Sequence, residues 1–137
     1  MVIRAASEQD LPAIADIQSA SPEASQWNPR DYLTYECRVA EEERAVVGFI
    51  VARPVAGMEW EILNLAVAPG ARRRGIGRQL LGDILARHAG DFFLEVRESN
   101  APAQRFYEYA GFRVITRRLQ YYDNPEEQAI VMKLFSC

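Results

Sequence analysis

The segment Arg72–Arg78 constrains the fold of this chain more than any other, because it joins two elements of different periodicity. Before it, Ile62–Ala68 is an apolar run with a single polar residue, Asn64, and the turn residues Pro69-Gly70 follow. After it, apolar side chains recur at the three- and four-residue spacing of one buried helix face: Ile76, Leu80, Leu81, Ile84 and Leu85. The pattern predicts a strand, a tight glycine-containing turn and a helix in direct succession.

The glycines of this turn also predict an anion site. Gly75 and Gly77 let the backbone approach a ligand closely, and the first N–H groups of a helix lack acceptors within it. The helix dipole and the flanking arginines both favour negative charge at this place. A solvated basic turn is the plain alternative. The Arg-x-x-Gly-x-Gly spacing between a strand and a helix favours a di- or triphosphate ligand.

The composition indicates one globular domain, residues 1–137, and argues against several functions. Apolar residues at 49% and charged residues at 26% are ordinary for a soluble protein, and the net charge of −3 argues against nucleic acid as the main partner. Two cysteines make no disulfide framework, so we expect a cytoplasmic protein. We expect no membrane partner, because no apolar run approaches a membrane span. The single histidine argues against a His-based metal site or a Ser-His-Asp triad, so no metal is expected. A monomer or a homodimer is expected.

Hydrophobic periodicity and turn residues predict the element order β-α-α-β-β-β-α-β-α-β-β. The expected strands are Val2–Ala5, Cys37–Glu41, Ala45–Arg53, Glu59–Ala68, Phe92–Val96, Phe112–Thr116 and Gln128–Phe135. The expected helices follow the N-cap Ser7, the pair Asn28-Pro29, the glycine turn (with Gly90 as its C-cap) and Asn100, the last ending at Tyr109. We expect an α/β fold with one mixed, mostly antiparallel twisted sheet of about seven strands and helices on both faces.

Three segments between Glu59 and Phe112 resemble the GNAT N-acetyltransferase superfamily. Arg72-x-x-Gly75-x-Gly77 matches the pyrophosphate loop with which that family binds coenzyme A. Leu94–Asn100 is similar to a strand that leads into an Asn at the next helix start, and Arg105–Phe112 is similar to an aromatic-Tyr-Glu-x-x-Gly-Phe signature. Within the superfamily the chain looks most like the ribosomal-protein-alanine N-acetyltransferases. The resemblance implies an acetyl-CoA-dependent N-acetyltransferase.

The same resemblance implies how the acetyl donor is held. The amides of Arg73–Arg78 hold the pyrophosphate, the arginine side chains add charge attraction, and the edge of the strand before the turn pairs with the pantetheine amides. Asn100 caps a helix, touches the cofactor, or does both. The expected cofactor-binding set is Leu65, Ala66, Val67, Arg72, Arg73, Arg74, Gly75, Ile76, Gly77, Arg78 and Asn100.

Glu95 and Tyr107 are the predicted catalytic residues. The matching family position makes Glu95 the general base that removes the proton of the attacking amine, whereas its plain alternative is an exposed pair with Arg97 on the same strand face. The signature makes Tyr107 the general acid for the departing thiolate, whereas its plain alternative is a core aromatic on a helix.

The expected reaction is direct attack of a primary amine on acetyl-CoA in a ternary complex, because no Cys or Ser stands in a nucleophile motif. The resemblance implies the N-terminal α-amino group of a protein as the acceptor. A lysine side chain, a small amine, or a catalytically silent acetyl-CoA sensor are the alternatives. Trp27, Tyr121 and Tyr122 are candidate acceptor contacts, and Arg117 and Arg118 either bind a peptide or cover the exposed end of the sheet.

Overall fold

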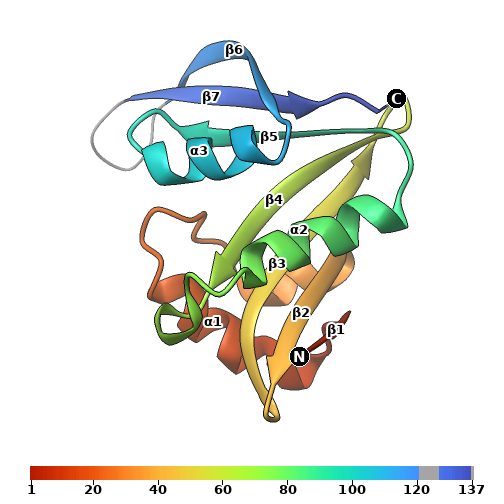
Figure 1. Ribbon diagram of the computed structural model, residues 1–137, viewed down its shortest axis with the longest axis vertical. Helices are drawn as coiled ribbons and strands as arrows, with labels where there is room; N and C mark the ends of the chain where they lie inside the picture. The colour runs from red at the N-terminus through yellow and green to blue at the C-terminus, as the bar shows by residue number, and fades with distance from the viewer. Residues whose placement is uncertain (121–126, 137) are drawn as a thin grey trace. The chain divides into compact units, whose positions relative to one another are not determined.

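The computed structural model describes residues 1–120 and 127–136. Its strands are β1 (Val2–Ala5), β2 (Glu36–Glu42), β3 (Ala45–Val55), β4 (Glu59–Val67), β5 (Asp91–Arg97), β6 (Arg113–Gln120) and β7 (Glu127–Leu134). Its α-helices are α1 (Leu11–Ser19), α2 (Ile76–Arg87) and α3 (Ala101–Tyr109), as labelled in Figure 1. Short 3₁₀ helices are η1 (Glu8–Asp10), η2 (Pro29–Thr34) and η3 (Pro69–Ala71).

The strands are hydrogen-bonded into one seven-stranded sheet in the order β1-β2-β3-β4-β5-β7-β6. Strand β4 pairs with β5 in parallel, with Glu59 opposite Asp91 and Glu61 opposite Phe93. A parallel pair needs a long crossover, and α2 supplies it. The pairs β1–β2, β2–β3, β5–β7 and β6–β7 are antiparallel. The predicted mixed, mostly antiparallel sheet is therefore confirmed.

The described chain divides into two compact units, and β4 contributes to both. The first unit comprises Met1–Arg53 with Ile62–Ala89, and the second comprises Pro54–Glu61 with Gly90–Cys137. The prediction of a single domain over residues 1–137 stays a prediction. In the described residues no helix is both long and apolar enough to cross a membrane.

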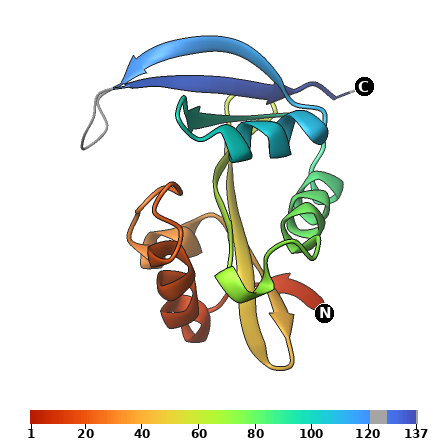
Figure 2. The same cartoon turned by 60° about the vertical axis from the view of Figure 1, so that its left-hand side comes forward.

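In the first unit, α1 and α2 cover opposite faces of β2, β3 and β4 (Figure 2). On one face, Ile14 and Ile17 of α1 and Tyr32 of η2 pack with alternate strand residues in a single buried cluster. On the other, a Cβ added to Gly48 of β3 would lie 3.1 Å from a methyl carbon of Leu80 of α2. Gly48 therefore lets α2 approach the sheet closely, and the expectation of helices on both faces is confirmed for this unit.

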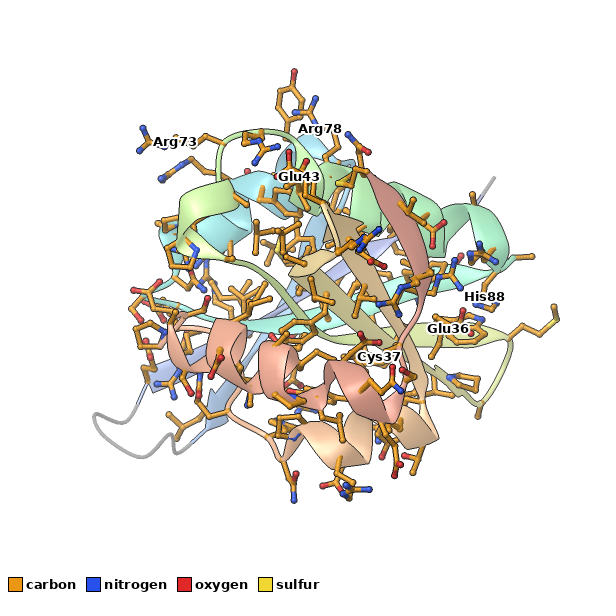
Figure 3. The ribbon with its side chains drawn as sticks, turned by 90° about the horizontal axis from the view of Figure 1, so that it is seen from below. Glu36, Cys37, Glu43, Arg73, Arg78 and His88 are labelled. Carbon is orange, nitrogen blue, oxygen red and sulfur yellow. The ribbon has the colours of Figure 1, made fainter. Side chains whose placement is uncertain are left out.

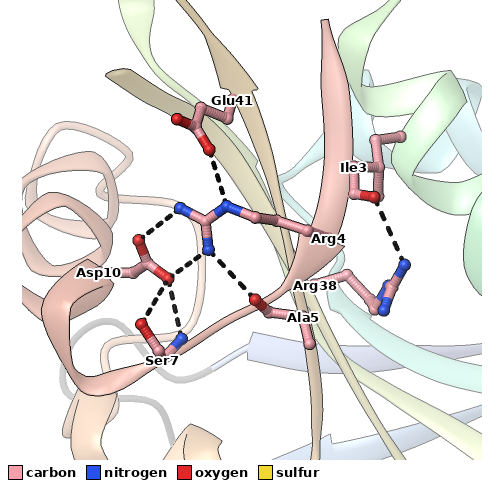
Figure 4. A network of polar contacts seen from close by, with 7 residues as sticks. All are labelled: Ile3, Arg4, Ala5, Ser7, Asp10, Arg38 and Glu41. Atoms are coloured by element: carbon pink, nitrogen blue, oxygen red, sulfur yellow. Dashed lines mark hydrogen bonds and ion pairs between the residues drawn. The ribbon is translucent and has the colours of Figure 1, made fainter. Parts of the chain in front are cut away.

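A polar network fixes the N-terminus of this unit (Figure 4). Arg4 of β1 donates to both carboxylate oxygens of Asp10, at 2.8 and 2.9 Å, and its Nε donates to Glu41 of β2 at 2.7 Å. The Asp10 carboxylate also accepts from the Ser7 N–H at 2.8 Å, which confirms the predicted capping. The Arg4 guanidinium holds the pKa of this nearly buried carboxyl below its usual value. The network joins β1, β2 and the start of α1.

The second unit is built on the alternation of β5. Phe92, Leu94 and Val96 are buried, whereas Phe93, Glu95 and Arg97 on the other face are half-buried. The ring of Trp60 at the start of β4 stacks on Phe92, with centroids 6.3 Å apart. Helix α3 lies along β5 (Figures 1 and 2).

Three expected elements differ from the observed ones. The helix after Asn28-Pro29 is the 3₁₀ helix η2. Gly90 is not a C-cap: α2 ends at Arg87, His88 is extended, and Gly90 has φ of 111° immediately before β5. A Cβ at Gly90 would lie 2.0 Å from the Met58 carbonyl oxygen, so the close approach of two backbones requires this glycine. Strand β6 extends to Gln120, because its pairing with β7 continues to Glu127.

Cys37 on β2 is predicted to make the first unit less stable at alkaline pH. Burial raises the pKa of its thiol to about 12 from an ordinary value of 9.0. Between these values the unfolded chain loses the thiol proton and the folded chain keeps it, so the unfolding free energy falls as pH rises. We expect a fall of about 1 kcal/mol per pH unit from this group.

The measurement is urea unfolding at about pH 8 and about pH 10.5, on the parent and on Cys37→Ala. The variant is expected to be less stable at the lower pH, because it loses buried contacts. Its decline between the two pH values should be shallower than that of the parent. Equal declines would show that the thiol does not keep its proton. The raised pKa of the buried Tyr107 affects both proteins alike, and the pKa of Tyr32 is raised chiefly by its burial and only secondarily by Cys37.

Candidate active site

The turn between β4 and α2 has the backbone of an anion cradle. After η3, Arg73 has φ of 66° and Gly75, the N-cap of α2, has φ of 79°. Successive N–H groups in such a mixed conformation point toward a common centre. The helical hydrogen-bond ladder starts with the Gln79 N–H, which donates to the Gly75 carbonyl at 3.0 Å. The amides of Ile76, Gly77 and Arg78 precede it and lack acceptors within the helix.

The four arginines of the turn divide into two pairs. Arg72 donates through Nε to the Val67 carbonyl at 3.0 Å and through Nη2 to the Ser21 hydroxyl at 2.9 Å. Arg74 donates to both carboxylate oxygens of Glu42 at 2.6 Å. These two side chains tie the turn to its own unit. Arg73 of the loop and Arg78 of the first turn of α2 are also exposed (Figure 3). Arg73 and Arg78 thus place exposed positive charge at the turn.

The cradle fits the pyrophosphate of coenzyme A. The space above Gly75 is open, because a Cβ built there would meet no atom within 4 Å. The first-turn amides, which lack acceptors within the helix, lie at the positive end of α2. Backbone donors, open space and two exposed guanidinium groups together make a site for a multiply charged phosphate.

A buried amide that sequence reasoning missed anchors β4 just before Leu65-Ala66-Val67. The Oδ1 of Asn64 accepts from the Leu65 N–H at 3.0 Å. Its Nδ2 lies 3.0 Å from the Ser25 carbonyl, 3.0 Å from the Tyr32 hydroxyl and 3.2 Å from the Gln18 Oε1. Asn64 thereby joins β4 to α1, to η2 and to the loop between them. Its one sequence signal is a polar residue inside an apolar strand.

The same network positions Trp27. The Gln18 Nε2 donates to the Trp27 carbonyl at 2.6 Å, and the Tyr32 hydroxyl donates to the Gln18 Oε1 at 2.5 Å. Gln18 is itself buried, so the polar groups that hold this loop lie inside the first unit. The Trp27 side chain is 42% exposed, which leaves its ring available for contact.

Glu95 lies at the centre of the half-buried face of β5. It pairs with Arg118 of β6, two strands away across β7. Its neighbour Arg97 donates to Glu127 at 3.2 Å, and Glu127 also accepts from the N–H and the hydroxyl of Ser99. Glu95 therefore has a charged partner on β6, and Arg97 has one on β7.

Tyr107 lies on α3 in the same unit and is buried between aromatic rings. Its ring meets Phe106 and Phe112 edge-on, at centroid distances of 5.1 and 5.4 Å. Burial raises the pKa of its phenol above the ordinary value of 10.0, so the group keeps its proton at every neutral pH. The Gln104 amide fixes α3 to the end of β5 by donating to the carbonyls of Arg97 and Glu98.

Asn100 is the N-cap of α3, since its Oδ1 accepts from the Ala103 N–H at 3.2 Å. Among the candidate acceptor contacts, Tyr121 and Tyr122 lie outside the described residues. The first unit thus holds the cradle, Leu65–Val67 and Trp27, and the second holds Glu95, Asn100 and Tyr107. Within residues 1–120 and 127–136, no group of three or more His, Cys, Asp and Glu side chains is placed to hold a metal ion.

Comparisons with known proteins match both the sequence and the fold. The model of the acetyltransferase (GNAT) family matches residues 5–112. A [ribosomal protein bS18]-alanine N-acetyltransferase of Salmonella typhimurium is 32% identical over 93% of each chain. A peptidyl-lysine N-acetyltransferase of Escherichia coli is 33% identical over 83% of this chain and 84% of its own. The crystal structure of Ard1 from Thermoplasma volcanium superposes with a TM-score of 0.89 at 29% identity, and covers 99% of this chain and 97% of that one.

Proposed function

The chain belongs to the acetyltransferase (GNAT) family and is an acetyl-CoA-dependent N-acetyltransferase, and we propose that its acceptor is the N-terminal α-amino group of a protein. The observation that carries the proposal is the match to a ribosomal-protein-alanine N-acetyltransferase over 93% of both chains. An α-amine has a pKa of about 8, well below that of lysine, so a single carboxylate base suffices for it.

In this proposal the amides of Arg73–Arg78 bind the pyrophosphate of acetyl-CoA, and Arg73 and Arg78 add charge. The edge of Leu65–Val67 pairs with the pantetheine amides as an added strand would. Asn64 supports this edge, because its side chain accepts from the Leu65 N–H and fixes the local backbone. Asn100 has a capping role that leaves its amide nitrogen for a contact with the donor.

Glu95 acts as the general base. The amine nitrogen attacks the thioester carbonyl carbon as the C–N bond forms and the C–S bond breaks. That nitrogen must lose one proton to become an amide, and the Glu95 carboxylate accepts it directly or through one water. The half-buried position of Glu95 on β5 suits this task, since the carboxylate is accessible from one side and held by Arg118 on another.

Tyr107 acts on the leaving group. The sulfur of coenzyme A becomes negative as the C–S bond breaks, and the phenol O–H donates a hydrogen bond to it. Because burial raises the pKa of Tyr107, the phenol is always in the donating form. A proton passes from the phenol to the thiolate through this bond, and solvent reprotonates the phenolate at once because the raised pKa makes it a strong base.

Tyr107→Phe is expected to lower kcat by about tenfold to a hundredfold, because one donor to the developing charge is lost. The phenylalanine ring keeps the packing against Phe106 and Phe112, so the melting temperature and the KM for acetyl-CoA should change little. Steady-state kinetics with varied acetyl-CoA separates the two quantities. An unchanged kcat would restrict Tyr107 to a packing role.

The function itself is tested by measuring free coenzyme A after mixing the protein with acetyl-CoA and peptides. The panel contains an Ala-starting peptide, the same peptide with its N-terminus blocked, and a blocked peptide with one lysine. We expect release with the first peptide and not with the second. Release with the lysine peptide alone would match the activity named for the peptidyl-lysine relative. No release with any amine would indicate a sensor of acetyl-CoA.

A further inference from the structure

Strand β6 brings one arginine onto the face of the second unit that carries Glu95. Arg118 is opposite Ala129 of β7, and Ala129 is opposite Arg97 of β5. Glu95 and Arg97 share a face of β5, so Arg118 belongs to that face as well. Arg117 is opposite Ile130, which is opposite Val96, and it belongs to the other face. The Arg118 guanidinium reaches across β7 and pairs with the Glu95 carboxylate.

Other cations on these three strands also have identified contacts. Arg97 pairs with Glu127 at 3.2 Å. Lys133 of β7 pairs with Glu59 at 2.6 Å and with Asp91 at 3.6 Å. Arg113 of β6 lies over the ring of Phe135, 5.3 Å from its centroid. Arg118 is a cation that pairs directly with the proposed base.

This pairing gives the base a fixed positive neighbour. A guanidinium stays protonated at every pH at which proteins are stable. A second cation that approaches Glu95 therefore comes close to the Arg118 guanidinium. It must either displace that guanidinium or be repelled by its charge. A neutral amine suffers no such repulsion. Lysine side chains, with a pKa of about 10.4, are almost entirely cationic at neutral pH, whereas α-amino groups, with a pKa of about 8, have a substantial neutral fraction.

We propose that Arg118 is a specificity-determining residue, whose charge beside Glu95 makes the site select α-amino groups over lysine side chains. The inference rests on the proposed function, because it assumes that Glu95 faces the acceptor amine. The acceptor then arrives as the free amine, and Glu95 takes its proton as the C–N bond forms. A surface ion pair contributes little to stability, which leaves room for this role in selection.

The test compares kcat/KM for an Ala-starting peptide with that for a blocked lysine peptide at about pH 7.5. Arg118→Gln is expected to raise the lysine-to-α-amine ratio about tenfold, because one unit charge next to the base is removed. Arg118→Lys keeps the charge and should keep the parental ratio. Arg117→Gln is the matched control, since it removes the same charge from the adjacent residue on the opposite face.

The pH dependence separates this role from a structural one. The effect of Arg118→Gln on the ratio should shrink toward about pH 10, where lysine itself becomes neutral. A loss of kcat/KM that is equal for both peptides, or an altered ratio that is the same at every pH, would overturn the inference. So would an equal change in Arg117→Gln.

The activity of the parent enzyme tests the proposed function separately from the inference about Arg118. Turnover of the Ala-starting peptide by the parent supports it. If the parent acetylates that peptide and Arg118→Gln leaves the ratio unchanged, the inference fails and the proposed function stands. If the parent does not acetylate it, both fail.

Discussion

Replacing Glu95 by glutamine is expected to reduce kcat/KM for the acceptor about a hundredfold to a thousandfold near neutral pH. The amide has nearly the shape of the carboxylate but cannot accept the proton of the attacking amine. In our proposal the turn before α2 holds the donor and Glu95 does not contact it, so the dissociation constant of acetyl-CoA should not change. Steady-state kinetics and calorimetric titration with acetyl-CoA measure the two effects.

The loss should depend on pH. At about pH 9 most of the acceptor α-amine is already neutral and hydroxide can take the remaining proton, so the deficit of Glu95→Gln should narrow. Glu98→Gln is the control, because it makes the same change at an exposed glutamate three residues further along. A deficit that is constant with pH, or one that Glu98→Gln shares, would remove Glu95 from the role of base.

Gly90→Ala is expected to lower the unfolding free energy by about 3 kcal/mol. Gly90 has φ of 111°, a conformation that residues with a Cβ rarely adopt. In addition, the new Cβ would lie 2.0 Å from the carbonyl oxygen of Met58, a backbone atom that cannot rotate away. The strand β5 that carries Glu95 begins at the next residue, so its entry into the sheet would shift. Urea unfolding measures the loss.

Substitutions at two other glycines separate the two causes of this loss, which are the strain of a positive φ and the contact with Met58. Gly57 has φ of 76° with open space around it, so Gly57→Ala should cost only the conformational strain, about 1 kcal/mol. Gly82 lies inside α2 with no atom near its missing Cβ, and Gly82→Ala should stabilise by about 0.5 to 1 kcal/mol. If Gly90→Ala cost no more than Gly57→Ala, the close approach to Met58 would not matter to folding.

The local features of the fold were predictable because they depend on neighbours in sequence. Rules that use only neighbouring residues predict the turn at Arg72–Arg78, the cap at Ser7 and the two faces of β5. The feature that was predicted wrongly, the role of Gly90, depends on backbone contacts with residues far away in the sequence. Gly90 suits a C-cap by its position after a helix, yet it is required by Met58, which no local pattern indicates.

The contacts that refine the site are long-range in the same sense. Asn64 and Gln18 meet across 46 positions, and sequence alone shows two ordinary polar residues. Arg118 pairs with Glu95 across β7, which lies between their strands, and Arg97 pairs with Glu127. The resemblance to the family supplied the candidate base and acid. Only the strand register shows which charge faces the base.

The most direct test of the proposed function is to locate the acetyl group on a peptide that offers both kinds of amine. The substrate begins with alanine and carries one internal lysine, and both amines are free. After incubation with the enzyme and acetyl-CoA, fragmentation mass spectrometry assigns the added acetyl group to one position. We predict that it lies on the α-nitrogen of alanine, with the lysine unmodified at early times. Acetylation of the lysine with a free N-terminus would contradict the account.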